Sequence, residues 1–212
     1  MPPAGHTLVI ECASEACSAA LFEGERLLDS RYEVLGRGHA ERLVPMIAEL
    51  PARGAADRIL VSLGPGSFTG VRIGIAAARA LGLAWKVPVL GYPTLALVAG
   101  MARDGAAEPV TACMNGGHGE WFVQSFDAGG MPETEATSLM PERAVALGHH
   151  PVIAGNRAGE LAALSSDPSV SVVNVLPDAA RAAALPDALF RRDLIPIYGR
   201  APDATPQRPV RC

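Results

Sequence analysis

Short apolar runs separated by turn residues open the chain. Residues 7–13 and 16–22 are almost continuously apolar, which is typical of buried strands. Glu23-Gly24 then supplies a tight hairpin turn before a third extended segment over roughly 26–33. The pattern therefore predicts three antiparallel strands at the start of the protein.

A helical periodicity follows this predicted meander. Residues 40–50 carry apolar side chains at the spacing of one helix face, namely Leu43, Met46, Ile47 and Leu50. Pro45 should kink this helix or lie in its first turns. The rest of the first half predicts a strand over 59–63, a glycine-rich turn over 64–70, a helix over 71–86, a strand over 87–91 and a helix over 93–103.

The second half of the chain repeats this order with weaker periodicity. It predicts strands near 109–114, 120–126 and 133–137, a helix near 141–147, a strand at 151–154, a helix at 157–164, a strand at 170–175 and a helix at 178–185. The short polar segment 104–108 is the expected seam. We therefore expect a first lobe over 1–105, a second lobe over 106–195 and a C-terminal tail over 196–212.

A βββαβα order that occurs twice in tandem predicts an α/β protein with the ribonuclease-H-like fold that actin-like ATPases duplicate. The composition agrees with two modest lobes, because 212 residues suffice for two small cores. Apolar residues make up 49% of the chain and charged residues only 19%. This low share of charge hints at an apolar face that a partner covers.

Charge and cysteine content exclude several classes of function. The net charge of −4 argues against tight tRNA binding by the chain alone, since such binding needs a clustered basic face. The four cysteines have neither CxxC nor zinc-type spacing, so we expect reduced thiols at Cys12, Cys17, Cys113 and Cys212. No apolar stretch approaches the length of a membrane span. These features predict a cytoplasmic protein.

The glycine-rich turn has two explanations that the spacing leaves open. Its position between a predicted strand and a predicted helix allows backbone N–H groups to hold an anion. Alternatively, the glycines supply turn conformations and Ser67 or Thr69 caps the following helix. The candidate phosphate or nucleotide residues in this turn are Gly64, Gly66, Ser67, Thr69 and Gly70. The turn matches neither a P-loop nor a nucleophile elbow.

The amino-acid identities in this turn say more about the family of the chain than the spacing of its glycines does. The string GPGSFTG over 64–70, followed by VRIG, strongly resembles the signature of the TsaB family, the partner subunit of the tRNA threonylcarbamoyltransferase complex. Five further segments resemble that family in order: ECASEACSAAL from Glu11, GHAERLVPMI from Gly38, PTL from Pro93, HGEWF from His118 and IPIYGRAPDATPQ from Ile195. The resemblance covers nearly the whole chain.

The resemblance implies a fold, partners and a process. By analogy with the family, the chain folds as two actin-like lobes, binds the catalytic subunit TsaD through its first lobe and works with the ATPase TsaE. The complex then transfers a threonylcarbamoyl group to adenosine 37 of tRNAs that read codons beginning with A. The chain itself is expected to meet tRNA only through the complex.

The chain departs from the nucleotide-binding pattern at the turn after the first strand. The candidate phosphate-turn residues there are Glu11, Cys12 and Ser14, and Cys12 replaces a hydroxyl residue of the family. The five histidines contain no i, i+4 pair of the kind that holds metal in the catalytic partner. We therefore expect no catalytic residue, no metal and no tightly bound cofactor in this chain, whereas ATP or ADP and Mg are possible in the complex. The alternative is a stand-alone actin-like ATPase, a small-molecule kinase or a glycopeptidase-like hydrolase.

The predicted helix over 71–86 is apolar or small around most of its circumference. Its only charges are Arg72, Arg79 and Lys86, which lie seven residues apart on one stripe. We therefore expect this helix and the preceding one to contact TsaD, and to form a homodimer when TsaD is absent. The predicted interface residues are Leu43, Met46, Ile47, Val71, Gly74, Ile75, Ala78, Leu81 and Gly82.

Overall fold

Five strands of the first half form one mixed sheet in the computed structural model, which describes residues 5–103 and 105–199. The strands are β1 (His6–Glu11), β2 (Ala16–Glu23), β3 (Arg26–Val34), β4 (Arg58–Ser62) and β5 (Val89–Tyr92). Their order across the sheet is β3-β2-β1-β4-β5. The first three strands are antiparallel, whereas β4 and β5 run parallel to β1.

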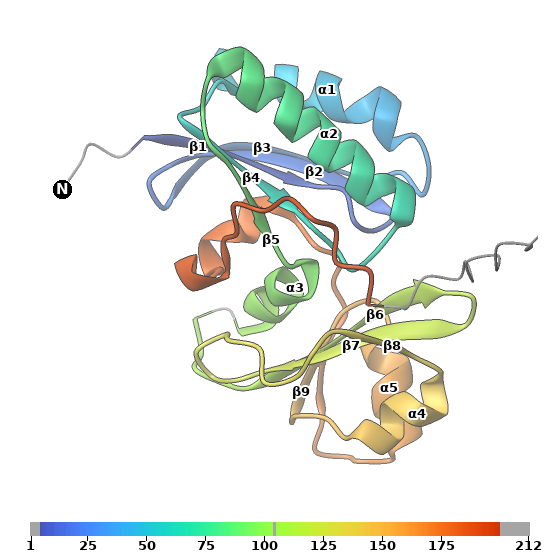
Figure 1. Ribbon diagram of the computed structural model, residues 1–212. Helices are drawn as coiled ribbons and strands as arrows, with labels where there is room; N and C mark the ends of the chain where they lie inside the picture. The colour runs from blue at the N-terminus through green and yellow to red at the C-terminus, as the bar shows by residue number, and fades with distance from the viewer. Residues whose placement is uncertain (1–4, 104, 200–212) are drawn as a thin grey trace, which may run out of the picture.

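Two helices cover the outer face of this sheet (Figure 1). They are α1 (His39–Ala48) and α2 (Phe68–Trp85), and the short 3-10 helix η1 (Pro51–Gly54) follows α1. Side chains alternate across a strand, so Leu8 and Ile10 of β1 pack under these helices while Val9 joins a core on the other face. The outer-face core is completed by apolar side chains of β2, β4, α1 and α2.

The second lobe repeats this arrangement. It contains β6 (Val110–Gly117), β7 (Glu120–Phe126), β8 (Thr137–Leu139), α4 (Pro141–Leu147), β9 (Val152–Ala154), α5 (Ala158–Ser165) and β10 (Ser171–Val173). The sheet order β10-β9-β6-β7-β8 is the order of the first sheet with each strand replaced by its counterpart. The structure thus confirms the predicted duplicated ribonuclease-H-like, actin-like fold.

Helix α3 (Thr94–Arg103) lies between the two sheets (Figure 1). Its buried side chains share one core with residues of both lobes, including Val9 of the first sheet and Phe122 of the second. The 3-10 helices η2 (Ala179–Ala184) and η3 (Asp187–Leu189) add buried alanine and leucine side chains to the same core. The core between the sheets therefore fastens the two lobes to each other.

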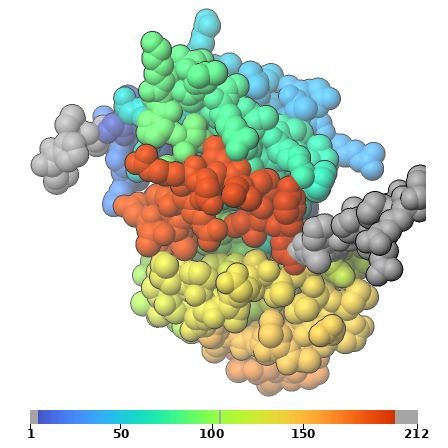
Figure 2. Space-filling model, viewed as in Figure 1, coloured from blue at the N-terminus to red at the C-terminus, as the bar shows by residue number. Residues whose placement is uncertain are grey.

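The last described segment, residues 190–199, returns across the front of the molecule between the lobes (Figure 2). Arg191 exchanges backbone hydrogen bonds with Gly91 at the edge of the first sheet, and the Ile197 N–H donates to the Leu63 carbonyl at 2.7 Å. The Gly199 carbonyl accepts from the Ser138 N–H of the second lobe. The proposed boundaries at 105 and 195 stay predictions, and most of the predicted 196–212 tail lies outside the described residues.

Several predicted elements need correction. The third strand of the second lobe is β8 at 137–139 rather than 133–137, because Thr134 bonds to β7 through its side chain and carbonyl without forming a ladder. The predicted helix 178–185 is instead the 3-10 helix η2. It ends before Leu185, because the following Pro186 favours an extended backbone at that residue. Helix α1 continues through Pro45, which lies in its interior. No helix among the described residues is long and apolar enough to span a membrane.

Candidate functional site

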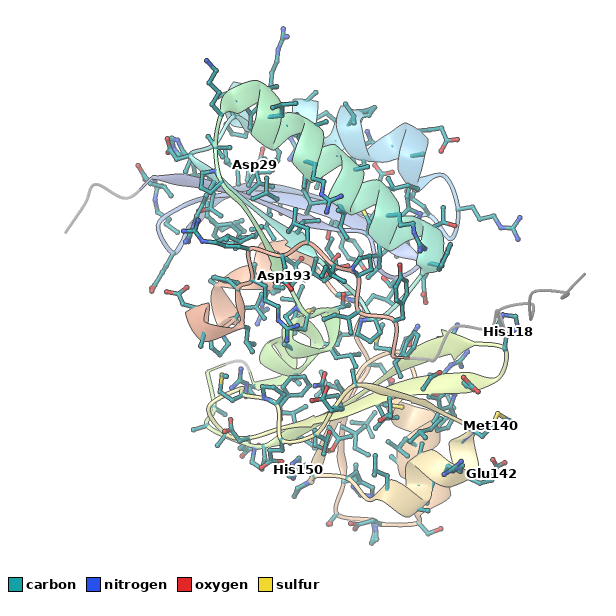
Figure 3. All side chains as sticks on the ribbon, in the orientation of Figure 1. Asp29, His118, Met140, Glu142, His150 and Asp193 are labelled. Atoms are coloured by element: carbon teal, nitrogen blue, oxygen red, sulfur yellow. The ribbon has the colours of Figure 1, made fainter. Side chains whose placement is uncertain are left out.

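A cleft of about 830 Å³ opens between the lobes. Two corresponding hairpins face each other across it, through residues 13–15 between β1 and β2 and through residues 115–118, which are the end of β6 and the start of its turn to β7. The start of α2 and the returning segment at Tyr198 complete its walls. Figure 3 shows His118 at the tip of the β6–β7 hairpin, on the rim of the second lobe. A pocket of this size matches the sites that hold small molecules.

Glu11 ends β1 beneath this cleft and does not line it. Its carboxylate is fully buried, accepts a hydrogen bond from the Ala13 N–H at 2.7 Å and accepts another from the Tyr92 hydroxyl at 3.2 Å. Burial raises the pKa of Glu11 to about 7, although these hydrogen bonds partly offset the rise. Glu11 therefore stabilises the turn that follows β1. With this pKa, its carboxyl group loses its proton near neutral pH.

The glycine-rich turn packs directly against the turn that follows β1. A Cβ on Gly66 would lie 2.0 Å from the Ala13 carbonyl oxygen, and one on Gly70 would lie 2.1 Å from that of Cys12. The Ser67 N–H donates to the Ala13 carbonyl at 2.6 Å. These glycines are needed because the two turns touch, and the amide of Ser67 already has a partner within the protein.

Ser67 has the structural role that the sequence left open. It is the N-cap of α2, and its hydroxyl accepts from the Gly70 N–H at 3.1 Å. Gly64 has a φ of +88°, a conformation that glycine adopts without strain. The helix therefore starts at Phe68, three residues before the predicted start. Anion binding by this turn stays a prediction, and Thr69 is exposed on the first turn of α2.

The other candidate residues of the β1–β2 turn are held in place by local hydrogen bonds. The Cys12 thiol is buried, with its sulfur 3.7 Å from that of Cys17. The hydrogen bond to Cys17, with burial, raises the pKa of Cys12 well above its usual value. The Ser14 hydroxyl accepts from the Ala16 N–H at 3.1 Å. Of the eight candidate phosphate residues, only Ser14, Gly66 and Ser67 line the cleft.

The predicted partner-facing stripe is in fact the side of α2 that packs on the protein's own sheet. A Cβ on Gly74 would touch the side chains of Cys12, Val61 and Ile10, and one on Gly82 would lie 2.4 Å from Val89 Cγ2. Leu81 is half-buried at the edge of the same core. The other predicted interface residues are buried in it, namely Leu43, Met46, Ile47, Val71, Ile75 and Ala78. The prediction that these side chains face a partner is therefore wrong in its choice of helix side.

The outer sides of the same two helices carry an exposed apolar surface. We call it the α1–α2 face and define it by Val44, Pro45 and Ala48 of α1 with Ala76, Ala80, Leu83 and Ala84 of α2. Leu83 is 82% exposed and Val44 is 56% exposed. The α1–α2 face points away from the second lobe (Figure 1). The sequence carried this signal, since α2 is apolar on both sides, but it did not say which side meets the sheet.

No histidine belongs to a metal site among residues 5–103 and 105–199, where no group of three His, Cys, Asp or Glu side chains could hold a metal ion. His39 is buried, and its Nε2 lies 3.0 Å from the Ser14 carbonyl. His118 is exposed at the cleft rim. His39 thus fastens α1 to the β1–β2 turn.

One side chain bridges the lobes across the cleft. The Asn156 amide donates to Glu15 Oε1 at 2.9 Å, and its oxygen accepts from the Asn115 N–H at 2.8 Å. Glu15 and Asn156 are 141 residues apart, so sequence reasoning missed the contact. Their pairing joins the first-lobe turn to the second lobe.

Comparison with known proteins agrees with the motifs. The model of the family described as "TsaD: tRNA N6-adenosine threonylcarbamoyltransferase" matches residues 33–164. The Escherichia coli tRNA threonylcarbamoyladenosine biosynthesis protein TsaB is 37% identical over 146 residues, which span 64% of this chain and 62% of that protein. An uncharacterized protein of Mycobacterium tuberculosis is 32% identical over 206 residues, covering 94% of this chain and 93% of that protein.

Solved structures extend the similarity to the whole fold. YeaZ from Pseudomonas aeruginosa superposes with a TM-score of 0.75 at 31% sequence identity, over 91% of this chain and 99% of that chain. A second Pseudomonas aeruginosa structure, described as similar to peptidase YeaZ, gives a TM-score of 0.76 at 30% identity, over 92% of this chain and 99% of that chain. The family that the motifs predicted is confirmed, and the chain belongs to the TsaB/YeaZ family.

Proposed function

We propose that this protein is a non-catalytic subunit of a tRNA threonylcarbamoyltransferase complex. In this role it holds a TsaD-type catalytic subunit, works with a TsaE-type ATPase and is required for threonylcarbamoylation of adenosine 37 in tRNAs that read codons beginning with A. Membership of the TsaB/YeaZ family supports the process, because the E. coli relative is named for tRNA threonylcarbamoyladenosine biosynthesis.

The α1–α2 face is the observation that carries the docking role. Its small residues Ala76, Ala80 and Ala84 recur every four positions, which permits another helix to approach closely. Leu83 stands out of this surface with 82% of its area in water. Exposed apolar patches of this kind mark protein interaction sites. Two helices of the TsaD-type subunit packed on α1 and α2 would cover the face.

The same face explains the expected behaviour of the isolated chain. An apolar surface without its usual partner can pair with its own copy about a two-fold axis, because each copy presents the same patch. We therefore expect the isolated chain to form a homodimer. Added TsaD should displace one copy and form a heterodimer with the other. Competition between the two assemblies follows directly, since both use the α1–α2 face.

The turn after β1 supports a role outside catalysis. Glu11 is engaged by Ala13 and Tyr92, and the Gly66–Gly70 turn contacts the carbonyls of Ala13 and Cys12. A polyphosphate with its metal would need the space and the N–H groups that these contacts use. The polyphosphate nucleotide and its magnesium therefore belong to the other subunits in this proposal, and the net charge of −4 leaves tRNA binding to the complex.

The docking role is tested by Leu83→Glu with Leu164→Glu as its matched control. Both leucines are exposed on a helix, Leu83 on α2 and Leu164 (53% exposed) on α5 of the second lobe. We expect Leu83→Glu to weaken TsaD binding by about 100-fold or more, because a carboxylate must then be desolvated in the contact. Leu164→Glu should bind normally.

Isothermal titration calorimetry measures both dissociation constants, and circular dichroism checks that both variants are folded. Unchanged TsaD affinity in folded Leu83→Glu would contradict docking through the α1–α2 face. Loss of binding in both variants would also contradict it, because Leu164 lies on the other lobe.

A further inference from the structure

The interlobe cleft combines apolar and polar walls. Phe68, Tyr198, Met114 and Phe122 line its apolar side, and the first two stand at its mouth with ring centroids 6.1 Å apart. Side chains that could orient a ligand, such as Asn156, lie on its polar side. Pockets with this division hold a flat apolar group and fix it through a few polar contacts.

Arg72 supplies a fixed positive charge at the cleft mouth. Its guanidinium carbon lies 3.3 Å from the centre of the Phe68 ring and 5.2 Å from that of Tyr198. Its N–H groups donate to the Phe68 carbonyl at 3.1 Å and to the Tyr198 hydroxyl at 2.6 Å. Within the described part of the chain it forms no ion pair with a carboxylate. A guanidinium held in this way has charge and donors that suit a phosphate.

Thr94 gives a second, independent indication of a ligand. It lines the cleft at the start of α3, is 1% exposed, and its hydroxyl has no hydrogen-bond partner among the described residues. Buried hydroxyls nearly always have a partner. A ligand that fills the cleft could supply the missing hydrogen bond.

The charges limit the ligand to one anionic group. Glu15, the only acidic residue of the cleft wall in the described chain, already accepts from Asn156. The positive charge of the cleft wall comes from Arg72, and exposed His118 lies on the opposite rim. The contacts between the two first-lobe turns leave no cradle for a chain of phosphates.

We propose that the interlobe cleft binds a small aromatic phosphate monoester, about the size of a nucleoside monophosphate. Arg72 binds the phosphate, and the ring lies against the aromatic wall formed by Phe68, Tyr198 and Phe122. This site is distinct from the α1–α2 face and does not depend on the docking role proposed above.

The test uses AMP as the probe and the fragments adenosine and ribose 5-phosphate as its parts. We expect AMP to bind one site per chain in calorimetry, and each fragment to bind at least about 10-fold more weakly. Amide shifts in ¹⁵N spectra should fall on residues 13–15 and 115–118. Mg–ATP that binds more tightly than AMP would overturn the single-phosphate account, and no AMP binding at about 1 mM would overturn the site itself.

Arg72→Met and Arg79→Met form a matched pair of variants. Both arginines are exposed on α2, and each donates to the returning segment, Arg72 to Tyr198 and Arg79 to the Leu194 carbonyl. Arg72→Met should lower the affinity for AMP by about 10-fold or more, whereas Arg79→Met should change that affinity by less than about 2-fold. Equal affinities in the two variants would overturn the role of Arg72.

Phe68→Ala keeps the test decisive if Arg72→Met fails to fold, because the Phe68 side chain is 64% exposed and its loss leaves no cavity. Phe68→Ala should weaken the binding of AMP but not that of ribose 5-phosphate, since only the contact with the base ring is lost. Leu83→Glu should bind AMP normally, and this result separates a failure of the cleft from a failure of the docking role.

Discussion

The two lobes have the same sheet order but very different helical layers. Helices α1 and α2 of the first lobe have 10 and 18 residues, whereas their counterparts α4 and α5 have 7 and 8. The third strand differs likewise, with 9 residues in β3 and 3 in β8. A five-stranded sheet therefore needs only short helices to cover it. The additional length in the first lobe creates an outer helical surface.

Within the first lobe, the two sides of α2 show the same division of roles. Ala78 is fully buried against the sheet, and Ala80, two positions later, is exposed on the α1–α2 face. One side of the helix thus stabilises the lobe and the other is free for a partner. Variants at these neighbouring positions should separate folding from association.

The largest expected effect is that of Ala78→Arg. A guanidinium forced between α2 and its sheet is both too large and unpaired, so the variant should lose at least about 4 kcal/mol of unfolding free energy or fail to fold. Ala80→Arg should stay within about 0.5 kcal/mol of the wild type, since it is a surface change. Urea denaturation measures both values. A stable, folded Ala78→Arg protein would show that this side of α2 is not packed on the sheet.

Glu11 should make the unfolding free energy depend on pH through the first lobe. The second lobe has no equivalent group, because β6, the counterpart of β1, carries no acidic residue. The pKa of Glu11 is raised to about 7 in the folded protein, so between about pH 4.5 and 7 the folded state binds more protons than the unfolded state. This contribution therefore stabilises the protein at low pH and is lost as the pH rises towards 7. Its full size is on the order of 3 kcal/mol.

Glu11→Gln should remove that dependence. The difference in unfolding free energy between variant and wild type should move in favour of the variant from pH 5 to pH 8 and then level off. Urea denaturation at several pH values measures it. Parallel profiles for the two proteins would mean that Glu11 stays ionised throughout this range.

The dimer that we propose for the isolated chain should be weakened by a surface change that leaves the first lobe folded. The isolated wild-type protein should be a dimer at micromolar concentration, and Leu83→Glu should shift its dissociation constant by about 100-fold, which corresponds to about 2.7 kcal/mol. Leu164→Glu in the second lobe should leave the dimer intact. Light scattering over a concentration series provides the masses. A monomeric wild-type protein at high concentration would refute the dimer.

The smallest expected effect concerns the cap of α2. Ser67→Ala removes the hydroxyl that accepts from the Gly70 N–H and should cost about 1 kcal/mol of unfolding free energy. Thr69→Ala, two residues later and exposed, is the control and should change little. The N-cap of α5, Arg157, makes no side-chain capping bond, so the counterpart of α2 in the second lobe lacks such a cap. Equal losses in the two variants would argue against a specific cap.

Much of this fold follows from local pattern. The apolar runs and the helical spacing of Leu43, Met46 and Ile47 predicted nearly every element, because strand and helix periodicities differ and turn residues separate them. The errors lie where non-local contacts decide, as at Thr134, where hydrogen bonds that involve side chains connect the segment to β7 and the ladder begins only at Thr137.

The site was less predictable for a physical reason. Small residues such as Gly74 and Gly82 permit close approach to any neighbour, and in this fold that neighbour is the sheet rather than another helix. The cleft requires both lobes and the return of the chain to Tyr198, which no local pattern encodes. The motif at 64–70 identified the family, but the contact of this turn with Ala13 appears only in three dimensions.

Reconstituted threonylcarbamoyl transfer to tRNA, with TsaD and TsaE supplied, tests the central claim most directly. The account predicts that Leu83→Glu abolishes transfer at protein concentrations that saturate the wild type, because the catalytic subunit is no longer held. It also predicts that Glu11→Gln transfers at the wild-type rate, because Glu11 only braces its own turn. A Glu11→Gln variant that binds TsaD normally and yet loses transfer would contradict the account and place chemistry in this chain.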